Sequence, residues 1–195
     1  MTYTNFTFET DADGIALVTW DMPDRSMNVI TMAVMDELEK IIEAVAGDAA
    51  IKGAVITSGK DAFSGGADLS MLEGMLAVHG PAAASGDEAA AKALLDGAAR
   101  LGNIYRRLET CGKPFVAAIN GTAMGGAFEL ALACHARVVA EGEKTKLGLP
   151  EVKVGLLPGA GGTQRVARMI DPQSALQMLL QGQELKVAKA KALGL

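Results

Sequence analysis

Aromatic side chains, cysteines and long apolar runs are scarce in this sequence of 195 residues. Phe, Tyr and Trp together make up 4% of it, and Cys111 and Cys134 are too few and too far apart for a metal-binding pattern. His79 and His135 have no second ligand three or four residues away, so we expect no metal site. No apolar stretch reaches membrane-spanning length, and residues 1–5 lack the basic and apolar regions of a signal peptide. We therefore expect a cytoplasmic protein with reduced thiols and no membrane span.

Basic charge is also in the minority. The chain carries 18 basic and 23 acidic residues, with no basic run. This balance argues against a nucleic-acid surface and against a polybasic membrane patch. Half of the residues are hydrophobic and 21% are charged, which suits one compact domain over residues 1–195.

The most informative stretch is residues 115–134. An apolar run at 115–119 precedes a glycine turn and an Ala/Leu-rich segment, which predicts strand, turn and helix. Gly125 and Gly126 fall at the start of this helix, where free N–H groups and the macrodipole favour a carbonyl oxygen or an anion. Glu129 follows in the first turn. Such a carboxylate often only answers the helix dipole, but apolar residues flank it on both sides, so we expect a buried Glu129 with a chemical role.

Before this stretch, the pattern predicts a hairpin over 6–20, a helix from Thr31 to Gly47 and a strand at 53–57. The segment 63–69 follows that strand and contains consecutive glycines, which let a backbone approach a ligand closely. Ala67 in this segment offers an N–H just before a short helix expected at 70–76. A plain turn between strand and helix explains this segment equally well.

Two further segments complete the pattern. Residues 77–90 are rich in Ala, Gly and Ser, so we expect a mobile loop there, followed by a helix that ends near residue 111. Residues 147–165 hold five glycines, two prolines and one carboxylate, Glu151. They match neither the phosphate-binding loop nor the dinucleotide pattern, because no Gly-Lys-Ser/Thr follows and Gln164 stands where the third glycine belongs. We interpret them as a tight loop around an active site that leads into a helix near Gly162.

Three of these stretches together resemble the crotonase (enoyl-CoA hydratase/isomerase) superfamily. The matching residues are 62–69 (Ala-Phe-Ser-Gly-Gly-Ala-Asp-Leu), 118–129 with Asn120-Gly121 and Gly125 to Glu129, and 148–165 with Gly-Leu-Pro-Glu and Pro-Gly-Ala-Gly-Gly-Thr-Gln-Arg. The resemblance implies an α/β fold built as a spiral of ββα units, as in ClpP, with two roughly perpendicular sheets surrounded by helices. It also implies an acyl-CoA substrate whose thioester oxygen is held by two N–H groups, those of Ala67 and Gly126 by position.

The resemblance further implies a reaction that uses both Glu129 and Glu151. Hydration of a 2-enoyl thioester needs water at C3 and a proton at C2, and two opposed carboxyl groups can supply both when one is ionised and the other protonated. In family hydratases the residue matching Glu129 activates water and the residue matching Glu151 protonates the α-carbon. Isomerases of 3-enoyl-CoA usually keep only the second acid. We therefore expect an enoyl-CoA hydratase, with 3-enoyl-CoA isomerase activity at the same site as an addition.

The motifs are most similar to the amino-terminal part of multifunctional β-oxidation α-subunits, where this site precedes a 3-hydroxyacyl-CoA dehydrogenase. We expect residues 1–195 to be a crotonase core that lacks the family's C-terminal strand and helices and any downstream dehydrogenase. Coenzyme A is then part of the substrate, this chain holds no cofactor, and NAD belongs only to a downstream domain. A homo-oligomer, or a thiolase partner in the full-length protein, is compatible with the resemblance.

Secondary candidates surround these four residues. Arg25 lies in a loop that approaches CoA phosphates in the family, although a solvated loop charge explains it as well. Asp68 reads as a helix cap, which leaves it outside catalysis. The remaining candidates for substrate contact are Gly65, Gly66, Gly125, Pro150 and Gly159.

Two other classes compete with a hydratase. An acyl-CoA-binding fragment without turnover would keep Ala67 and Gly126 but would gain nothing from two acids. A serine peptidase on the related spiral fold would need an activated serine, and Ser64 has no convincing histidine and acid beside it.

Overall fold

The computed structural model describes residues 2–195, and its chain begins with the predicted hairpin. Strands β1 (Phe6–Thr10) and β2 (Ile15–Trp20) are antiparallel, with Phe6 opposite Trp20. Asp11 makes the turn between them, because its carboxylate accepts from the N–H groups of Asp13 and Ile15. The prediction for residues 6–20 is therefore confirmed.

A five-stranded sheet grows from this hairpin. Its order is β1-β2-β3-β4-β6, in which β3 is Gly53–Ser58, β4 is Phe115–Ile119 and β6 is Ala136–Val139. Every pairing after β1–β2 is parallel. Parallel neighbours require crossover connections, and helices supply them.

Helix α1 (Met32–Gly47) makes the first crossover. Thr31 caps it by accepting from the N–H of Val34, as predicted. Its six buried residues repeat with the 3.6 period that the sequence predicts: Val34, Met35, Leu38, Ile41, Ile42 and Val45. This apolar face packs into the core, and α1 also contacts α3 (Glu88–Thr110).

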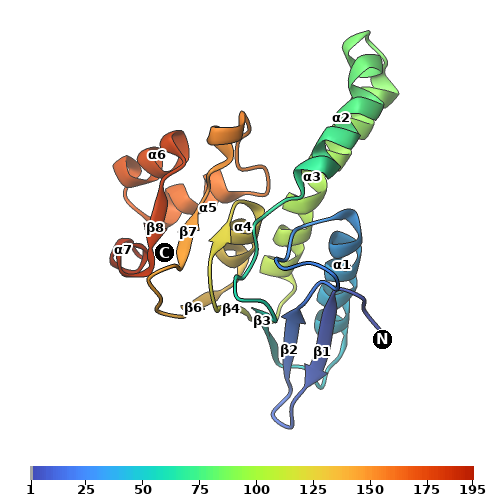
Figure 1. Cartoon of the computed structure of the whole chain (residues 1–195). Helices are drawn as coiled ribbons and strands as arrows, with labels where there is room; N and C mark the ends of the chain where they lie inside the picture. The colour runs from blue at the N-terminus through green and yellow to red at the C-terminus, as the bar shows by residue number, and fades with distance from the viewer. Residues whose placement is uncertain (1) are drawn as a thin grey trace.

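The prediction of a loop at residues 77–90 is wrong. Helix α2 spans Leu69–Ala84, and only residues 85–87 separate it from α3. Alanine favours helix strongly. Pro81 lies in the last turn of α2 on an exposed side, so it removes one helical hydrogen bond near the end and leaves the preceding turns intact. Helices α2 and α3 pack against each other and form an arm that rises above the body of the molecule (Figure 1). We call α2, which protrudes beside the N-terminal part of α3, the helical arm.

A second, three-stranded sheet lies beside the first. It consists of β5 (Ala123–Met124), β7 (Lys146–Gly148) and β8 (Glu184–Lys186). Helices α5 (Gly162–Met169), α6 (Pro172–Gln181) and α7 (Val187–Leu193) surround it in the orange and red part of the chain (Figure 1). Gly194 ends α7 and the N–H of Leu195 returns to the carbonyl of Ala190, which is the predicted cap.

Helix α4 (Gly126–Ala133) lies at the centre of the molecule, between the two sheets (Figure 1). All eight of its residues are buried, because α3, α5 and strands of both sheets contact it. The fold therefore carries Glu129 into the core, as the apolar flanks of that residue predict.

Candidate active site

The site is organised around the first turn of α4. The side chain of Glu129 points away from solvent, with 2% of the residue exposed. A buried carboxylate needs hydrogen-bond donors, because desolvation otherwise favours its neutral form. Two backbone N–H groups supply them: those of Ala160 at 2.9 Å and Gly162 at 2.7 Å, both to Oε1 of Glu129.

The loop that carries Ala67 is fastened beside the start of α4. Its backbone pairs with Ile30 on one side, while Ser64 pairs with Ala123 on the other. Gly66 is required here for two reasons. Its φ of +95° lies in the left-handed region, and a Cβ on it would lie 2.7 Å from the carbonyl oxygen of Met124. The two loops therefore meet at a distance that excludes a side chain.

This close approach brings two N–H groups together. A Cβ on Gly126 would lie 3.9 Å from the nitrogen of Ala67, and a Cβ on Gly66 would lie 3.4 Å from the nitrogen of Gly126. Within residues 2–195, neither N–H donates to a protein acceptor. The N–H of Gly126 also stands at the positive end of α4. Two such donors can hold one oxygen atom that gains negative charge.

Glu151 approaches the same place from the other side. It begins a short 3₁₀ helix (Glu151–Val154) behind Pro150, and a Cβ on Gly125 would lie 3.2 Å from its Oε1. Its Oε2 is buried, and no hydrogen-bond partner for it exists among residues 2–195. The structure thus brings Glu129, Glu151, Ala67 and Gly126 together.

Burial raises the pKa of both carboxyl groups, but different neighbours oppose the rise. Burial raises the pKa of Glu151 to about 7, and the charge of Glu129 adds to the rise. Burial also raises the pKa of Glu129, but the N–H groups of Gly162 and Ala160 and the charge of Arg165 oppose that effect. At neutral pH, hydrogen bonding therefore favours an ionised Glu129 beside a Glu151 that can still carry a proton.

The secondary candidates Arg25, Asp68 and Gly65 differ in exposure and in their hydrogen-bond partners. Arg25 is exposed and its guanidinium forms an ion pair with Asp68 at 3.2 Å. Asp68 caps α2 through the N–H of Ser70, as predicted, and the Ser70 hydroxyl bond lowers its pKa. Gly65 donates to the carbonyl of Asn28.

The remaining candidates flank the carboxylates. Gly125 takes a φ of +56° and donates to the carbonyl of Gly148, which sets the entry to α4. Pro150 lies directly before Glu151 at the start of its helix. Gly159 precedes Ala160 in the loop that holds Glu129 and lines an open groove of about 560 Å³ between α3 and α5.

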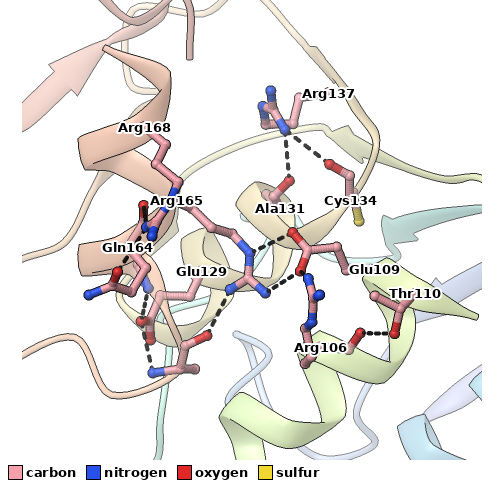
Figure 2. Close-up of polar contacts among 12 residues, drawn as sticks. Arg106, Glu109, Thr110, Glu129, Ala131, Cys134, Arg137, Gln164, Arg165 and Arg168 are labelled. Carbon is pink, nitrogen blue, oxygen red and sulfur yellow. Dashed lines mark hydrogen bonds and ion pairs between the residues drawn. The ribbon is translucent and has the colours of Figure 1, made fainter. Parts of the chain in front are cut away.

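Sequence reasoning missed several supporting residues. Tyr105 on α3 is fully buried and its hydroxyl donates to the carbonyl of Gly126 at 2.8 Å. Arg165 on α5 donates to the carbonyl of Ala160, and Glu109 on α3 accepts from Arg165 (Figure 2). The motif that ends in Arg165 marks that residue, but no pattern in the sequence connects it with Glu109.

The chain belongs to the enoyl-CoA hydratase/isomerase family, whose model matches residues 10–195. Among curated relatives, the fatty acid oxidation complex subunit alpha of Idiomarina loihiensis is 42% identical over 192 residues. The match covers 97% of this chain and 25% of that protein, so the chain spans about a quarter of the length of such relatives. The resemblance to β-oxidation α-subunits is thereby confirmed.

Solved structures confirm the crotonase fold. The enoyl-CoA hydratase of Bacillus anthracis is similar with a TM-score of 0.81 and 29% identity, over 97% of this chain and 67% of that chain. A protein of Geobacillus kaustophilus HTA426, also described as an enoyl-CoA hydratase, gives a TM-score of 0.84 and 28% identity over 100% and 67%. Within residues 2–195, no helix combines the length and apolar character needed to cross a membrane.

Proposed function

We propose that this chain hydrates 2-enoyl-CoA thioesters in fatty-acid β-oxidation. The observation that carries the proposal is the pairing of two carboxyl groups beside two N–H groups that have no acceptor among residues 2–195: Glu129 accepts from two backbone N–H groups, and Glu151 has a buried oxygen without a donor. The family membership and the α-subunit relatives support the acyl-CoA substrate. The thioester oxygen would lie between the N–H groups of Ala67 and Gly126.

The proposed reaction balances with these groups alone. Ionised Glu129 accepts a proton from a water molecule as the water oxygen bonds to C3. The electron pair of the double bond moves toward the thioester, whose oxygen gains charge against Ala67 and Gly126. Protonated Glu151 then gives its proton to C2, and the 3-hydroxyacyl thioester results. Proton exchange between the two carboxyls and solvent restores the starting state.

The same site supports isomerisation of 3-enoyl-CoA as a second activity. That reaction removes a proton from C2 and returns one to C4, with the same enolate oxygen between the two N–H groups. Glu151, with a pKa of about 7, is suited to accept and return a proton near neutral pH. Hydration remains the primary proposal because isomerisation does not require a second acid.

An acyl-CoA-binding protein without turnover is the second candidate. The chain covers 67% of each of the two solved hydratases, so their remaining third has no counterpart in it. Binding without turnover would follow if that third is needed to order the two carboxylates. The free N–H groups of Ala67 and Gly126 would still hold a thioester oxygen.

Loss of enoyl-thioester absorbance on mixing the protein with crotonoyl-CoA tests the proposal. Turnover supports the hydratase, and appearance of that absorbance from a 3-enoyl-CoA would add the isomerase. If neither occurs, calorimetric titration with crotonoyl-CoA decides between the remaining outcomes. Binding without turnover would favour the second candidate, and no binding would contradict both.

A further inference from the structure

Arg165 hydrogen-bonds to two segments next to Glu129 and so connects three elements of the fold. Its Nη1 donates to the carbonyl of Ala160 at 3.0 Å, while Nε and Nη2 donate to the two carboxylate oxygens of Glu109, each at 3.2 Å. Figure 2 shows the guanidinium between Glu109 and Glu129. Helix α5, helix α3 and the loop that holds Glu129 therefore meet at one side chain.

Ala160 is held from both ends by this arrangement. Its N–H donates to Glu129 and its carbonyl accepts from Arg165. The residues on either side are Gly159, which is exposed, and Gly161, which has a φ of +97°. A segment with two glycines has many alternative conformations, so its single observed geometry depends on such anchors. A Cβ on Gly161 would also collide with the Arg165 guanidinium, so the glycine leaves room for the anchor.

Glu109 in turn fixes the guanidinium of Arg165. The contact is bidentate, a geometry that fixes the plane of a guanidinium as well as its position. Arg165 has 13% of its side chain exposed, so solvent screens this pair less than an exposed surface pair. Arg106 also donates to Glu109, from one turn earlier on α3.

The positive charge of Arg165 also acts on Glu129, in addition to the hydrogen bonds that fix the loop. Arg165 opposes the rise that burial causes in the pKa of Glu129. A cation that favours the ionised carboxylate keeps the group ready to accept a proton. Within residues 2–195, neither Arg165 nor Glu109 hydrogen-bonds to Glu129, so both effects act from outside the reacting groups.

We propose that Arg165, fixed by Glu109, is a positioning residue that holds the Ala160 peptide so that Glu129 stays oriented and ionised for its reaction with water. This inference rests on the proposed hydratase function. Because Arg165 acts through Ala160 and not through the substrate, its loss should lower kcat and leave KM for 2-enoyl-CoA nearly unchanged. Displacing a reacting group by about 1 Å costs on the order of a hundredfold in rate.

Three variants separate geometry from charge. Arg165→Gln removes both, and we expect kcat to fall roughly tenfold to a hundredfold, with the acid limb of the pH–rate profile moved to higher pH. Arg165→Lys keeps the charge but cannot reach both partners with a planar fork, so kcat should fall less and the acid limb should stay near that of the parent. Glu109→Gln weakens only the outer contact.

A matched control and a double variant complete the design. Arg168 lies three residues after Arg165 on the same helix, is exposed, and within residues 2–195 hydrogen-bonds only to Gln164, so Arg168→Gln should leave kcat and the pH profile unchanged. If Glu109 acts through Arg165, the pair Glu109→Gln and Arg165→Gln should be no slower than Arg165→Gln alone. If the fold-losses in kcat of the two single variants multiply in the double variant, Glu109 does not act through Arg165.

A measurement without turnover keeps this inference distinct from the proposed function. In protein labelled with ¹³C at glutamate carboxyls, the Glu129 resonance is identified by its loss in Glu129→Gln, and its pKa is read by titration. We expect a higher pKa in Arg165→Gln and a near-parental one in Arg165→Lys and Arg168→Gln. If the parent protein does not hydrate crotonoyl-CoA, the proposed hydratase function alone is contradicted. If Arg165→Gln has the parental Glu129 pKa and the parental kcat, the positioning role of Arg165 is contradicted. If Arg165→Gln fails to fold, Arg165→Lys and Glu109→Gln test the geometric part alone: we expect a lowered kcat with a nearly parental KM in both, and parental kcat in both would overturn the positioning role.

Discussion

Glu129 and Glu151 show how two identical side chains obtain different roles from their surroundings. Glu129 is the more deeply buried, yet two backbone N–H groups stabilise its charge. Glu151 is less deeply buried, but one of its oxygens has no donor among residues 2–195, and the charge of Glu129 faces it. Hydrogen-bond donors therefore favour the charged form of Glu129 despite its greater depth, whereas burial raises the pKa of Glu151 to about 7.

The raised pKa of Glu151 makes the stability of the fold depend on pH. The folded state binds this proton more tightly than the unfolded state, so the contribution is fully present below about pH 4.5 and is lost as pH rises through about 7. We expect Glu151→Gln to raise the free energy of unfolding at pH 8 by about 1–3 kcal/mol, allowing for partial solvent exposure, and by much less at pH 5. Urea unfolding at both pH values measures this difference.

Glu73→Gln is the control for that experiment, because Glu73 is exposed on α2 and far along the chain from the site. Its effect should be small and the same at both pH values. Equal effects of Glu151→Gln at pH 5 and pH 8 would show that the carboxyl is not perturbed in the folded protein.

Gly66 offers a second test at the scale of one residue. Gly66→Ala places a Cβ against the carbonyl of Met124 and forces a side chain into a left-handed conformation. We expect a loss of about 2–4 kcal/mol in unfolding free energy, because strain and clash add, together with a lower kcat/KM as the N–H of Ala67 moves. Denaturant unfolding and the crotonoyl-CoA assay measure the two effects.

The matched control is Gly86→Ala. Gly86 has nearly the same φ, +94°, but nothing lies within 4 Å of the added Cβ. Strain alone should cost about 1 kcal/mol there and leave kcat/KM unchanged. If both variants behave alike, close contact between the two loops does not matter to the site.

Single residues were predictable where a local pattern defines them. The apolar flanks of Glu129 predict its burial, and the position of Asp68 before α2 predicts its capping role. Arg165 and Glu109 could not be joined in the same way, because 56 positions separate them and only the packing of α5 near α3 brings them together. Such contacts leave no periodic trace in one sequence.

At the scale of elements, helices α2 and α4 differ most in the burial of their residues. Every residue of α4 is buried, whereas α2 has none that is buried. A helix draws most of its stability from the packing of an apolar face, so the helical arm depends largely on local propensity and on its contact with α3. The alanine-rich stretch forms helix where glycine and proline predicted a loop, because each breaker lies near an end or on an exposed side.

Hydrogen exchange should reveal this difference directly. We expect amides in residues 69–84 to exchange through local opening of the arm, at rates orders of magnitude above those of α4 and β4. Mass spectrometry of peptides after deuterium labelling measures it, with α1 as an internal reference whose apolar face is buried. Protection of α2 equal to that of α1 would mean that the arm is held by more than its contact with α3.

The whole molecule places four separated segments at one point. The loop at 63–69, the turn at 125–129, Glu151 and the loop at 159–162 converge because the parallel sheet, the second sheet and α4 bring their ends together. The hairpin, α1, β3, β4 and α4 were predictable from periodicity and from the motifs, whereas the full length of α2 and the short strands of the second sheet were not. The closure of the two sheets around α4 was available only through resemblance, since no local rule fixes how crossover units pack.

The central claim is that Glu129 and Glu151 act as one unit in hydration. The most direct test compares crotonoyl-CoA hydration rates of the parent, Glu129→Gln, Glu151→Gln and the double variant. We expect each single change to lower kcat by roughly a hundredfold to ten-thousandfold, and the double variant to be no slower than the slower single one, because groups that act together fail together. Near-parental turnover in either single variant would contradict the two-carboxylate mechanism.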